Sequence, residues 1–224
     1  MIYAIGDLHL PGGMEKPMDV FGKHWEDHFS RIREDWTARV RETDVVLIPG
    51  DISWAMNLAP ALEDLRSIDS LPGRKILLRG NHDYWWNSIG RLREALPPTI
   101  RAVQNDALET DGTVFCGSRG WTWDDIPENR RIYERELLRM ELSLKKAKTL
   151  GGERLVVMTH FPPLNEAHED TPMSELIASY APSDVVYGHL HGASLKNAFN
   201  GERAGIRYHC VSCDGLGFRL KEIP

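Results

Sequence analysis

The sequence predicts an α/β fold whose strands carry metal-binding side chains at their carboxyl ends. Five short apolar runs each end in a residue that can bind a metal: IYAIGDLH, VVLIPGD, KILLRGNH, LVVMTH and DVVYGHLH. Between the first two runs, residues 23–42 space their apolar side chains three and four apart, as in an amphipathic helix. Because strand ends meet at one edge of an open α/β sheet, the repeated ligands indicate one metal site there.

The candidate ligands are carboxylates, imidazoles and one amide: Asp7, His9, Asp51, Asn81, His160, His189 and His191. Nitrogen and oxygen ligands of this kind suit manganese, iron, zinc or nickel. A structural zinc site would instead be closed by four thiolate or imidazole ligands. The set is too large for one tetrahedral ion but fits two ions that share a bridging carboxylate. Two metals about 3.5–4 Å apart clamp an in-line displacement at phosphorus, which indicates phosphoester hydrolysis.

Each motif is a weaker indicator alone than in combination. Asp7 and His9 would point the same way if the chain stays extended there, but an Asp-x-His pair is common. The pair Gly50-Asp51 is also typical of a turn after a strand. Residues 188–192 (GHLHG) are more specific, because two histidines would share one side of an extended segment flanked by glycines. The conjunction of the motifs favours a site over separate structural roles.

The series GDLH, GD, GNHD, TH and GHLH resembles the calcineurin-like metallophosphoesterase superfamily, a binuclear metal phosphohydrolase family, from Gly6 to Gly192. The resemblance implies a four-layer αββα sandwich, in which two mixed β-sheets are flanked by helices. It implies one ion held by Asp7, His9, Asp51 and His191. It implies a second ion held by Asp51, Asn81, His160 and His189. Asp51 would bridge the ions, and His82 would contact the substrate phosphate and protonate the leaving oxygen.

One motif departs from the protein serine/threonine phosphatases, which also show the run LLRGNH found here at residues 77–82. Those enzymes extend GD to GDxxDRG, whose second acid orients the catalytic histidine and whose arginine holds the phosphate. Residues 50–55 read GDISWA and lack both, which argues against protein phosphatase activity. Asp83, the neighbour of His82, is expected to cap the following helix. UDP-diacylglucosamine hydrolases share the opening GDLHL but carry arginine at the position of His82, which argues against that assignment.

The composition agrees with a soluble intracellular enzyme. A chain of 224 residues that is 42% hydrophobic can bury one sizeable core, and we expect residues 1–224 to form a single domain. The sequence opens without a basic leader, and no apolar run approaches the roughly 20 residues of a membrane span. Three cysteines argue for a reducing compartment. We expect a cytoplasmic protein with no membrane partner.

The charge balance points to a small substrate. The formal net charge is −6, from 33 acidic and 27 basic residues, and the bases alternate with acids as they do over residues 130–148. Proteins that grip long nucleic acids usually carry a basic stripe, which this sequence lacks. We therefore expect a small phosphorylated substrate, with nucleotides among the candidates. A dimetal pocket attracts phosphate locally, so the end of an oligonucleotide also stays open.

Tryptophans beside the ligand motifs are candidates for substrate contact. Trp54 and Trp85 follow ligand motifs closely, and Trp121 and Trp123 share another loop. Indole rings could stack on a flat leaving group, since such stacking is worth about 1–3 kcal/mol per base. Alternatively, the rings bury the underside of the loops.

The remaining patterns predict the connecting elements. Further helices are expected over residues 57–68, 87–96 and 129–150, the last ended by two glycines. The apolar stripe of the last helix fits either a core or a partner subunit. Strands of a second sheet are expected over residues 113–117 and 205–213. His24 and His28 are expected to be solvated or to support the site without binding metal.

The predicted activity is metal-dependent hydrolysis of phosphodiesters or small phosphomonoesters. Two cations would lower the pKa of a bridging water, and the resulting metal-bridging hydroxide would attack phosphorus. His82 would donate the proton to the leaving group. The alternative is a catalytically inactive scaffold or protein-interaction module with this fold. Such a chain should have lost ligands, whereas every expected position is filled here.

Overall fold

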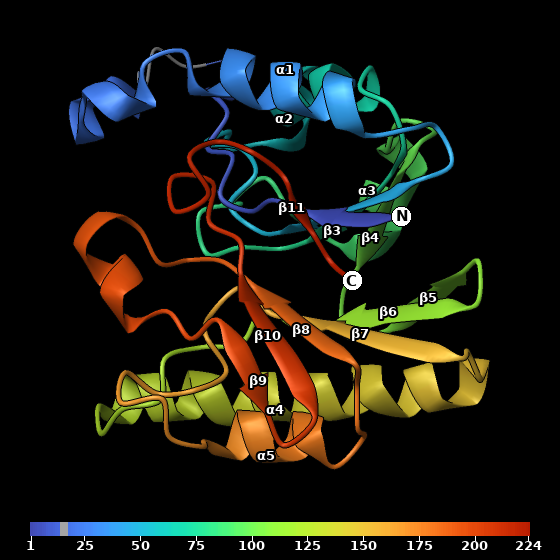
Figure 1. The fold of residues 1–224 in the computed structure, drawn as a ribbon, viewed down its shortest axis with the longest axis vertical. Helices are drawn as coiled ribbons and strands as arrows, with labels where there is room; N and C mark the ends of the chain where they lie inside the picture. Colours follow the sequence, from blue (N-terminus) through green and yellow to red (C-terminus); the bar gives the residue numbers. More distant parts are fainter. Residues whose placement is uncertain (14–17) are drawn as a thin grey trace. The chain divides into compact units, whose positions relative to one another are not determined.

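A computed structural model describes residues 1–13 and 18–224, which form two compact units (Figure 1). The first unit comprises Met1–Ala102 and Val211–Pro224, and the second comprises Val103–Cys210. Each unit has its own β-sheet, helices and apolar core. These two mixed sheets with their helices confirm the predicted α/β class and are consistent with an α/β sandwich fold. The single domain expected from the sequence stays a prediction.

The sheet of the first unit places the first three ligand motifs at one edge. Its order is β11 (Lys221–Glu222), β1 (Ile2–Ala4), β2 (Val45–Pro49), β3 (Arg74–Leu78) and β4 (Ile100–Val103). β11 is antiparallel to β1, whereas β1, β2 and β3 are mutually parallel. Ala4 lies opposite Leu47, which lies opposite Ile76. The segments that follow these three strands therefore leave the sheet side by side.

Helices cover one face of this sheet (Figure 1). They are η1 (Met18–Phe21), η2 (Lys23–Trp25), α1 (His28–Arg39), α2 (Leu58–Asp69) and α3 (Ile89–Ala95). The helix expected over residues 23–42 is divided, because Asp27 adopts a left-handed φ of 48° and α1 begins after it. Apolar residues of the helices and of alternate strand positions form one core, which includes Ile32, Trp36, Leu65, Val46, Ile48 and Leu77.

The sheet of the second unit has four parallel strands between two antiparallel edges. Its order is β5 (Ala107–Thr110), β6 (Thr113–Gly117), β7 (Arg154–Met158), β8 (Asp184–Tyr187), β10 (Ile206–Cys210) and β9 (Gly201–Arg203). β6 has the bounds expected from the sequence, and the strand expected over residues 205–213 is β10, which ends earlier. β7 and β8, which precede the histidine motifs, are parallel neighbours.

Helices α4 (Pro127–Leu150) and α5 (Pro172–Ala178) lie on one face of this second sheet (Figure 1). A short helix, η3 (Gly192–Asn197), follows the last histidine motif. The apolar stripe of α4 is buried in the core of its own unit through Tyr133, Met140, Leu144 and Ala147. This stripe is therefore core, which decides between the two alternatives. Gly151 caps the helix in the left-handed conformation, with a φ of 67°, as the sequence predicts.

Cys116, Cys210 and Cys213 are free thiols, all of them buried. Burial raises the pKa of Cys116 to about 12, so this thiol is held in its unreactive protonated form. No helix within residues 1–13 and 18–224 is long and apolar enough to span a bilayer.

The buried carboxylate of Asp184 joins three parallel strands at their amino ends. Arg154 on β7 donates to it at 2.6 Å, Arg207 on β10 at 2.8 Å, and Ser183 at 2.7 Å. The Nε2 atom of His209, also on β10, lies 2.9 Å from it. Burial alone would raise the pKa of Asp184, but these hydrogen bonds outweigh burial and hold the pKa well below its usual range.

Replacing this carboxylate should destabilise the second unit. We expect Asp184→Asn to lower the free energy of unfolding by about 3 kcal/mol, the lower end for a buried pair, because both arginines are partly exposed. Because the pKa of Asp184 is lowered in the folded state, its carboxylate stabilises the protein above about pH 4. This contribution is lost as the pH falls further. The difference from wild type in urea unfolding should therefore shrink between pH 7 and pH 3.

The matched control is Asp170→Asn. This side chain is 45% exposed and pairs with Arg203, so its loss should cost less than about 1 kcal/mol. Equal effects of the two substitutions would contradict the structural role of Asp184.

Candidate metal centre

In the first unit, the ligand-bearing loops are held together by backbone hydrogen bonds. Asp7 follows β1, Asp51 follows β2 and Asn81 follows β3. The amide of Asp7 donates to the carbonyl of Gly50 at 3.0 Å, and the amide of His9 donates to the carbonyl of Asp51 at 3.0 Å. The first two loops thus continue the parallel pairing of their strands beyond the sheet edge.

Three of the predicted ligands in the first unit adopt left-handed backbone conformations. The φ angles are 58° at Asp7, 46° at His9 and 51° at Asp51. The segment from Asp7 to His9 is therefore not extended, and turns bring these side chains together. Such conformations cost non-glycine residues about 1–3 kcal/mol each and persist where the surroundings fix them, often at functional sites.

The side chains of Asp7, His9 and Asp51 form a buried cluster. Their exposed fractions are 0%, 5% and 2%. The Nε2 atom of His9 lies 3.9 Å from a carboxylate oxygen of Asp51, and a carboxylate oxygen of Asp7 lies within 4.8 Å of a ligand atom of each of the other two. Two carboxylates buried so close together repel unless a cation compensates them. Their oxygens and the imidazole nitrogen suit a divalent metal ion.

The carboxylate of Asp83 fixes the loops that carry Asp51 and Asn81. It accepts hydrogen bonds from four backbone amides: Gly80 (2.7 Å), Asp51 (2.9 Å), Ile52 (2.9 Å) and Ser53 (3.2 Å). Burial and the Asp51 carboxylate raise the pKa of Asp83 to about 6, against the effect of these amide donors. The expectation that Asp83 caps the following helix is wrong, because α3 begins after Ser88.

Gly80 allows the third loop to lie directly against Asp51. A Cβ atom at Gly80 would lie 2.1 Å from a carboxylate oxygen of Asp51, so only glycine fits. The same oxygen of Asp51 accepts a hydrogen bond from the amide of His82 at 2.9 Å. The predicted bridging carboxylate is therefore oriented by the loop that carries Asn81 and His82.

In the second unit, two predicted ligands meet at the carboxyl ends of β7 and β8. The Nε2 atom of His160 lies 3.3 Å from the Nδ1 atom of His189. His160 is fully buried, and His189 has a φ of 72°, so the expectation of an extended segment from His189 to His191 is wrong. His191 is half-buried, and its amide donates to the hydroxyl of Ser194 at 2.9 Å at the start of η3. Two converging imidazole nitrogens also suit a metal ion.

The four candidate tryptophans have different surroundings. Trp85 is fully buried and donates to Asp83 at 3.0 Å, so it supports the loop and offers no open face to a substrate. Trp54 is half-buried, with its ring stacked 4.8 Å from that of His9. Trp121 packs against Phe161, 4.7 Å between ring centres. Trp123 is 38% exposed and packs against Tyr133, which belongs to α4.

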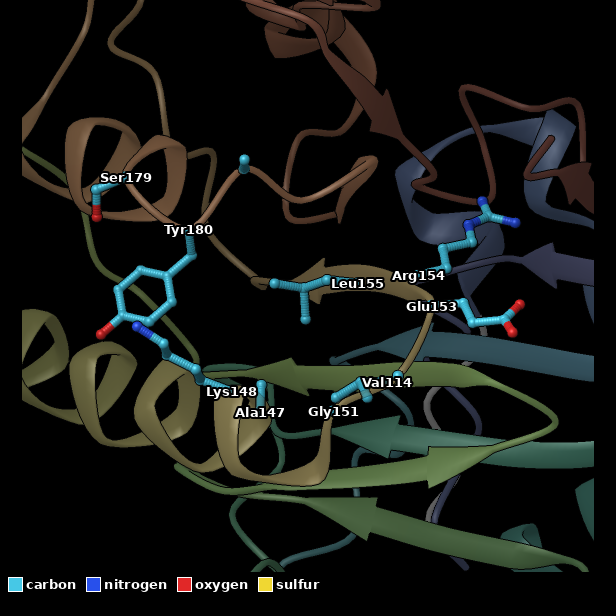
Figure 2. Close-up of a pocket in the computed structure, with 11 residues that line it drawn as sticks. Val114, Ala147, Lys148, Gly151, Glu153, Arg154, Leu155, Ser179 and Tyr180 are labelled. Carbon is cyan, nitrogen blue, oxygen red and sulfur yellow. The ribbon is translucent and has the colours of Figure 1, made fainter.

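The second unit also contains a cavity of about 470 Å³ (Figure 2). It is lined by the ends of α4 and α5 and the start of β7, including Lys148, Glu153, Leu155 and Tyr180. Since His160 follows the opposite end of β7, this cavity is separate from the histidine pair.

The sequence of this chain is similar to those of known proteins. The family model of the calcineurin-like phosphoesterases matches residues 1–193. A Gene 66 protein of Mycobacterium phage D29 is 24% identical over 204 residues, which cover 90% of this chain and 84% of that protein.

Two solved structures have a similar fold. A protein of unknown function from Aquifex aeolicus, AQ665, has a TM-score of 0.51 and 18% identity, with 98% of this chain and 94% of that chain covered. Phosphopantetheinyl hydrolase from Mycobacterium tuberculosis has a TM-score of 0.55 and 13% identity, with 94% and 89% covered.

Removing the carboxylate of Asp83 should destabilise the first unit. Asp83→Ala leaves several buried amides without their acceptor, so we expect the free energy of unfolding to fall by about 3–5 kcal/mol. Urea unfolding monitored by tryptophan fluorescence measures the change. Asp125→Ala is the control, since that side chain is 95% exposed and its removal should change stability by less than about 0.5 kcal/mol. A similar, small effect of both substitutions would contradict the role assigned to Asp83.

Proposed function

The chain belongs to the calcineurin-like phosphoesterase family, and from this premise we propose that it is a binuclear metal-dependent phosphohydrolase. The observation that carries the proposal is the buried cluster of Asp7, His9 and Asp51. Two adjacent buried carboxylates and an imidazole are a costly arrangement without a cation and a favourable one with it. The substrates we propose are phosphodiesters or small phosphomonoesters.

The proposed metal ligands all come from the five sequence motifs. One ion would be held by Asp7, His9, Asp51 and His191. The other would be held by Asp51, Asn81, His160 and His189. The contacts of Asp51 within the first unit support its role as the bridge, because the amide of His82 orients its carboxylate and Gly80 leaves room for it. The donor set suits manganese, iron, zinc or nickel.

The proposed chemistry divides between the metals and the protein. When bound, the two ions supply an activated water and neutralise charge on the phosphate oxygens. His82 donates a proton to the departing oxygen. The Nδ1 atom of His82 is buried, so the proton has to leave from Nε2. The amide of the same residue binds Asp51, which ties the proton donor to the bridging carboxylate.

We also propose a small phosphorylated substrate and a cytoplasmic location. A small phosphorylated substrate, with nucleotides among the candidates, fits the interleaved acidic and basic residues better than a long nucleic acid. The free buried cysteines support a reducing, cytoplasmic compartment.

Metal content and activity together test the proposal. We expect wild-type protein to bind two metal ions and to hydrolyse bis-(p-nitrophenyl) phosphate or p-nitrophenyl phosphate with manganese, and to lose activity after chelation. Asp51→Asn should lower metal content at both positions, whereas His9→Ala should mainly weaken one, as measured by elemental analysis. Two tightly bound ions in Asp51→Asn would contradict the bridge. A protein without metal or activity would favour the inactive scaffold.

A substrate screen with manganese present would narrow the substrate class. It should include nucleotides and phosphopantetheinyl esters, the latter because one structural neighbour is a phosphopantetheinyl hydrolase.

His82 should affect esters according to their leaving group. A nitrophenolate departs readily as an anion, whereas an alkoxide or ribose oxygen needs a proton in the transition state. We therefore expect His82→Ala to keep both metals but to slow hydrolysis of alkyl esters by about 10²–10⁴-fold, with a smaller loss for nitrophenyl esters. Comparison of kcat for the two ester types measures the difference. An equal loss for both would assign His82 to phosphate binding instead.

A further inference from the structure

We infer that Trp54 is a positioning residue that holds the imidazole of His82 in the orientation needed for proton transfer. The inference rests on the proposed function, since it gives a role to a group that supports His82. It gives Trp54 a role other than substrate stacking, which is one of the two alternatives that the sequence leaves open.

The imidazole of His82 is not oriented by a hydrogen bond from its buried nitrogen. The Nδ1 atom is buried and has no hydrogen-bond partner among residues 1–13 and 18–224. The backbone of His82 is fixed, because its amide donates to Asp51 at 2.9 Å. Rotation of the ring about its side-chain bonds must therefore be restrained by the groups packed against it.

Aromatic rings supply that restraint. The ring of Trp54 lies nearest, with its centre 4.7 Å from that of His82 and the planes tilted by 52°. The ring of Tyr84 is 6.2 Å away in an edge contact, and its side chain is 50% exposed. The ring of His9 is 5.9 Å away. Of these three rings, that of Trp54 is the nearest to His82 and the largest.

Trp54 can act as a fixed support because it is itself anchored. Its amide donates to the carbonyl of Leu10 at 2.9 Å, and its indole nitrogen donates to the sulfur of Met18 at 3.3 Å. The preceding residue, Ser53, donates its amide to Asp83 at 3.2 Å. The indole therefore belongs to the same hydrogen-bonded framework as the Asp51 loop.

One indole contacts two functional groups of the proposed centre. Its ring lies 4.8 Å from that of His9, nearly parallel at 21°, and 4.7 Å from that of His82. The indole is half-buried and stacks on His9, which favours a supporting role over stacking on a leaving group. The arrangement keeps the proton donor at a set position relative to a metal ligand.

The kinetic consequence follows from geometry. A misplacement of about 1 Å can cost about 10²-fold in rate. We expect Trp54→Leu to lower kcat for alkyl phosphoesters by about 10- to 10²-fold, with a smaller effect on nitrophenyl esters. Trp54→Phe keeps a ring and should recover most of the loss. In a His82→Ala background, Trp54→Leu should cause no further loss of leaving-group dependence.

If Trp54 stacked on the substrate instead, its replacement would change the kinetic parameters differently. Loss of a stacking ring would raise KM for substrates with a flat leaving group and leave kcat for alkyl esters unchanged. That result, or an equal loss of kcat for both ester types, would overturn the inference. Tyr180→Leu, which removes a half-buried ring from the separate cavity at the start of β7, is the control and should leave both parameters unchanged.

An NMR measurement separates this inference from the proposed function. The imidazole resonances of His82, assigned by comparison with His82→Gln, should show a ring-current shift that is lost in Trp54→Leu and partly kept in Trp54→Phe. Unchanged resonances in Trp54→Leu would overturn the positioning role, whatever the activity. A wild-type protein that hydrolyses no phosphoester, while its His82 resonances still respond to Trp54→Leu, would instead remove the proposed function.

Discussion

The carboxylate of Asp83 is the contact on which the architecture of the first unit's site depends. Its hydrogen bonds hold the amides of Asp51, Ile52 and Ser53, which follow β2, against the loop that follows β3. A single buried acid thereby fixes two ligand loops relative to each other. The cost of burying this charge is offset by several amide donors, as buried carboxylates require. Gly80 completes the junction, because any side chain there would collide with Asp51.

Strained backbone accompanies four of the predicted ligand positions, in both units. Asp7, His9, Asp51 and His189 all have positive φ angles. These conformations allow side chains to turn inward as soon as a strand ends, whereas an extended chain would send alternate side chains to opposite faces. The parallel strands and the loop hydrogen bonds supply the constraint that keeps the strained turns in place. Turns with positive φ angles therefore follow strands of both sheets, at Asp7 and Asp51 in the first unit and at His189 in the second.

Aromatic residues next to the predicted ligands mainly contact other side chains of the protein. Trp85 donates to Asp83, and Trp54 packs against both His9 and His82. In the second unit, the ring of Phe161 contacts those of Trp121 and His189, with centres 4.7 Å and 4.0 Å away. Packing of this kind restricts the rotation of an imidazole without adding charge near it. Aromatic rings therefore pack against three histidines of the proposed site, His9, His82 and His189.

The sequence by itself determined the strands, most of the helices and the types of side chain at the strand ends. Apolar runs mark β2 and β7, and Gly151 marks the end of α4, because these signals depend on neighbouring residues. Tertiary structure alone decided the left-handed turns and the partners of Asp83. It also decided whether an indole such as Trp85 faces inward. These features depend on hydrogen bonds and packing between segments some 30 positions apart, such as Asp83 with Ile52 and Ser53, which local patterns do not encode.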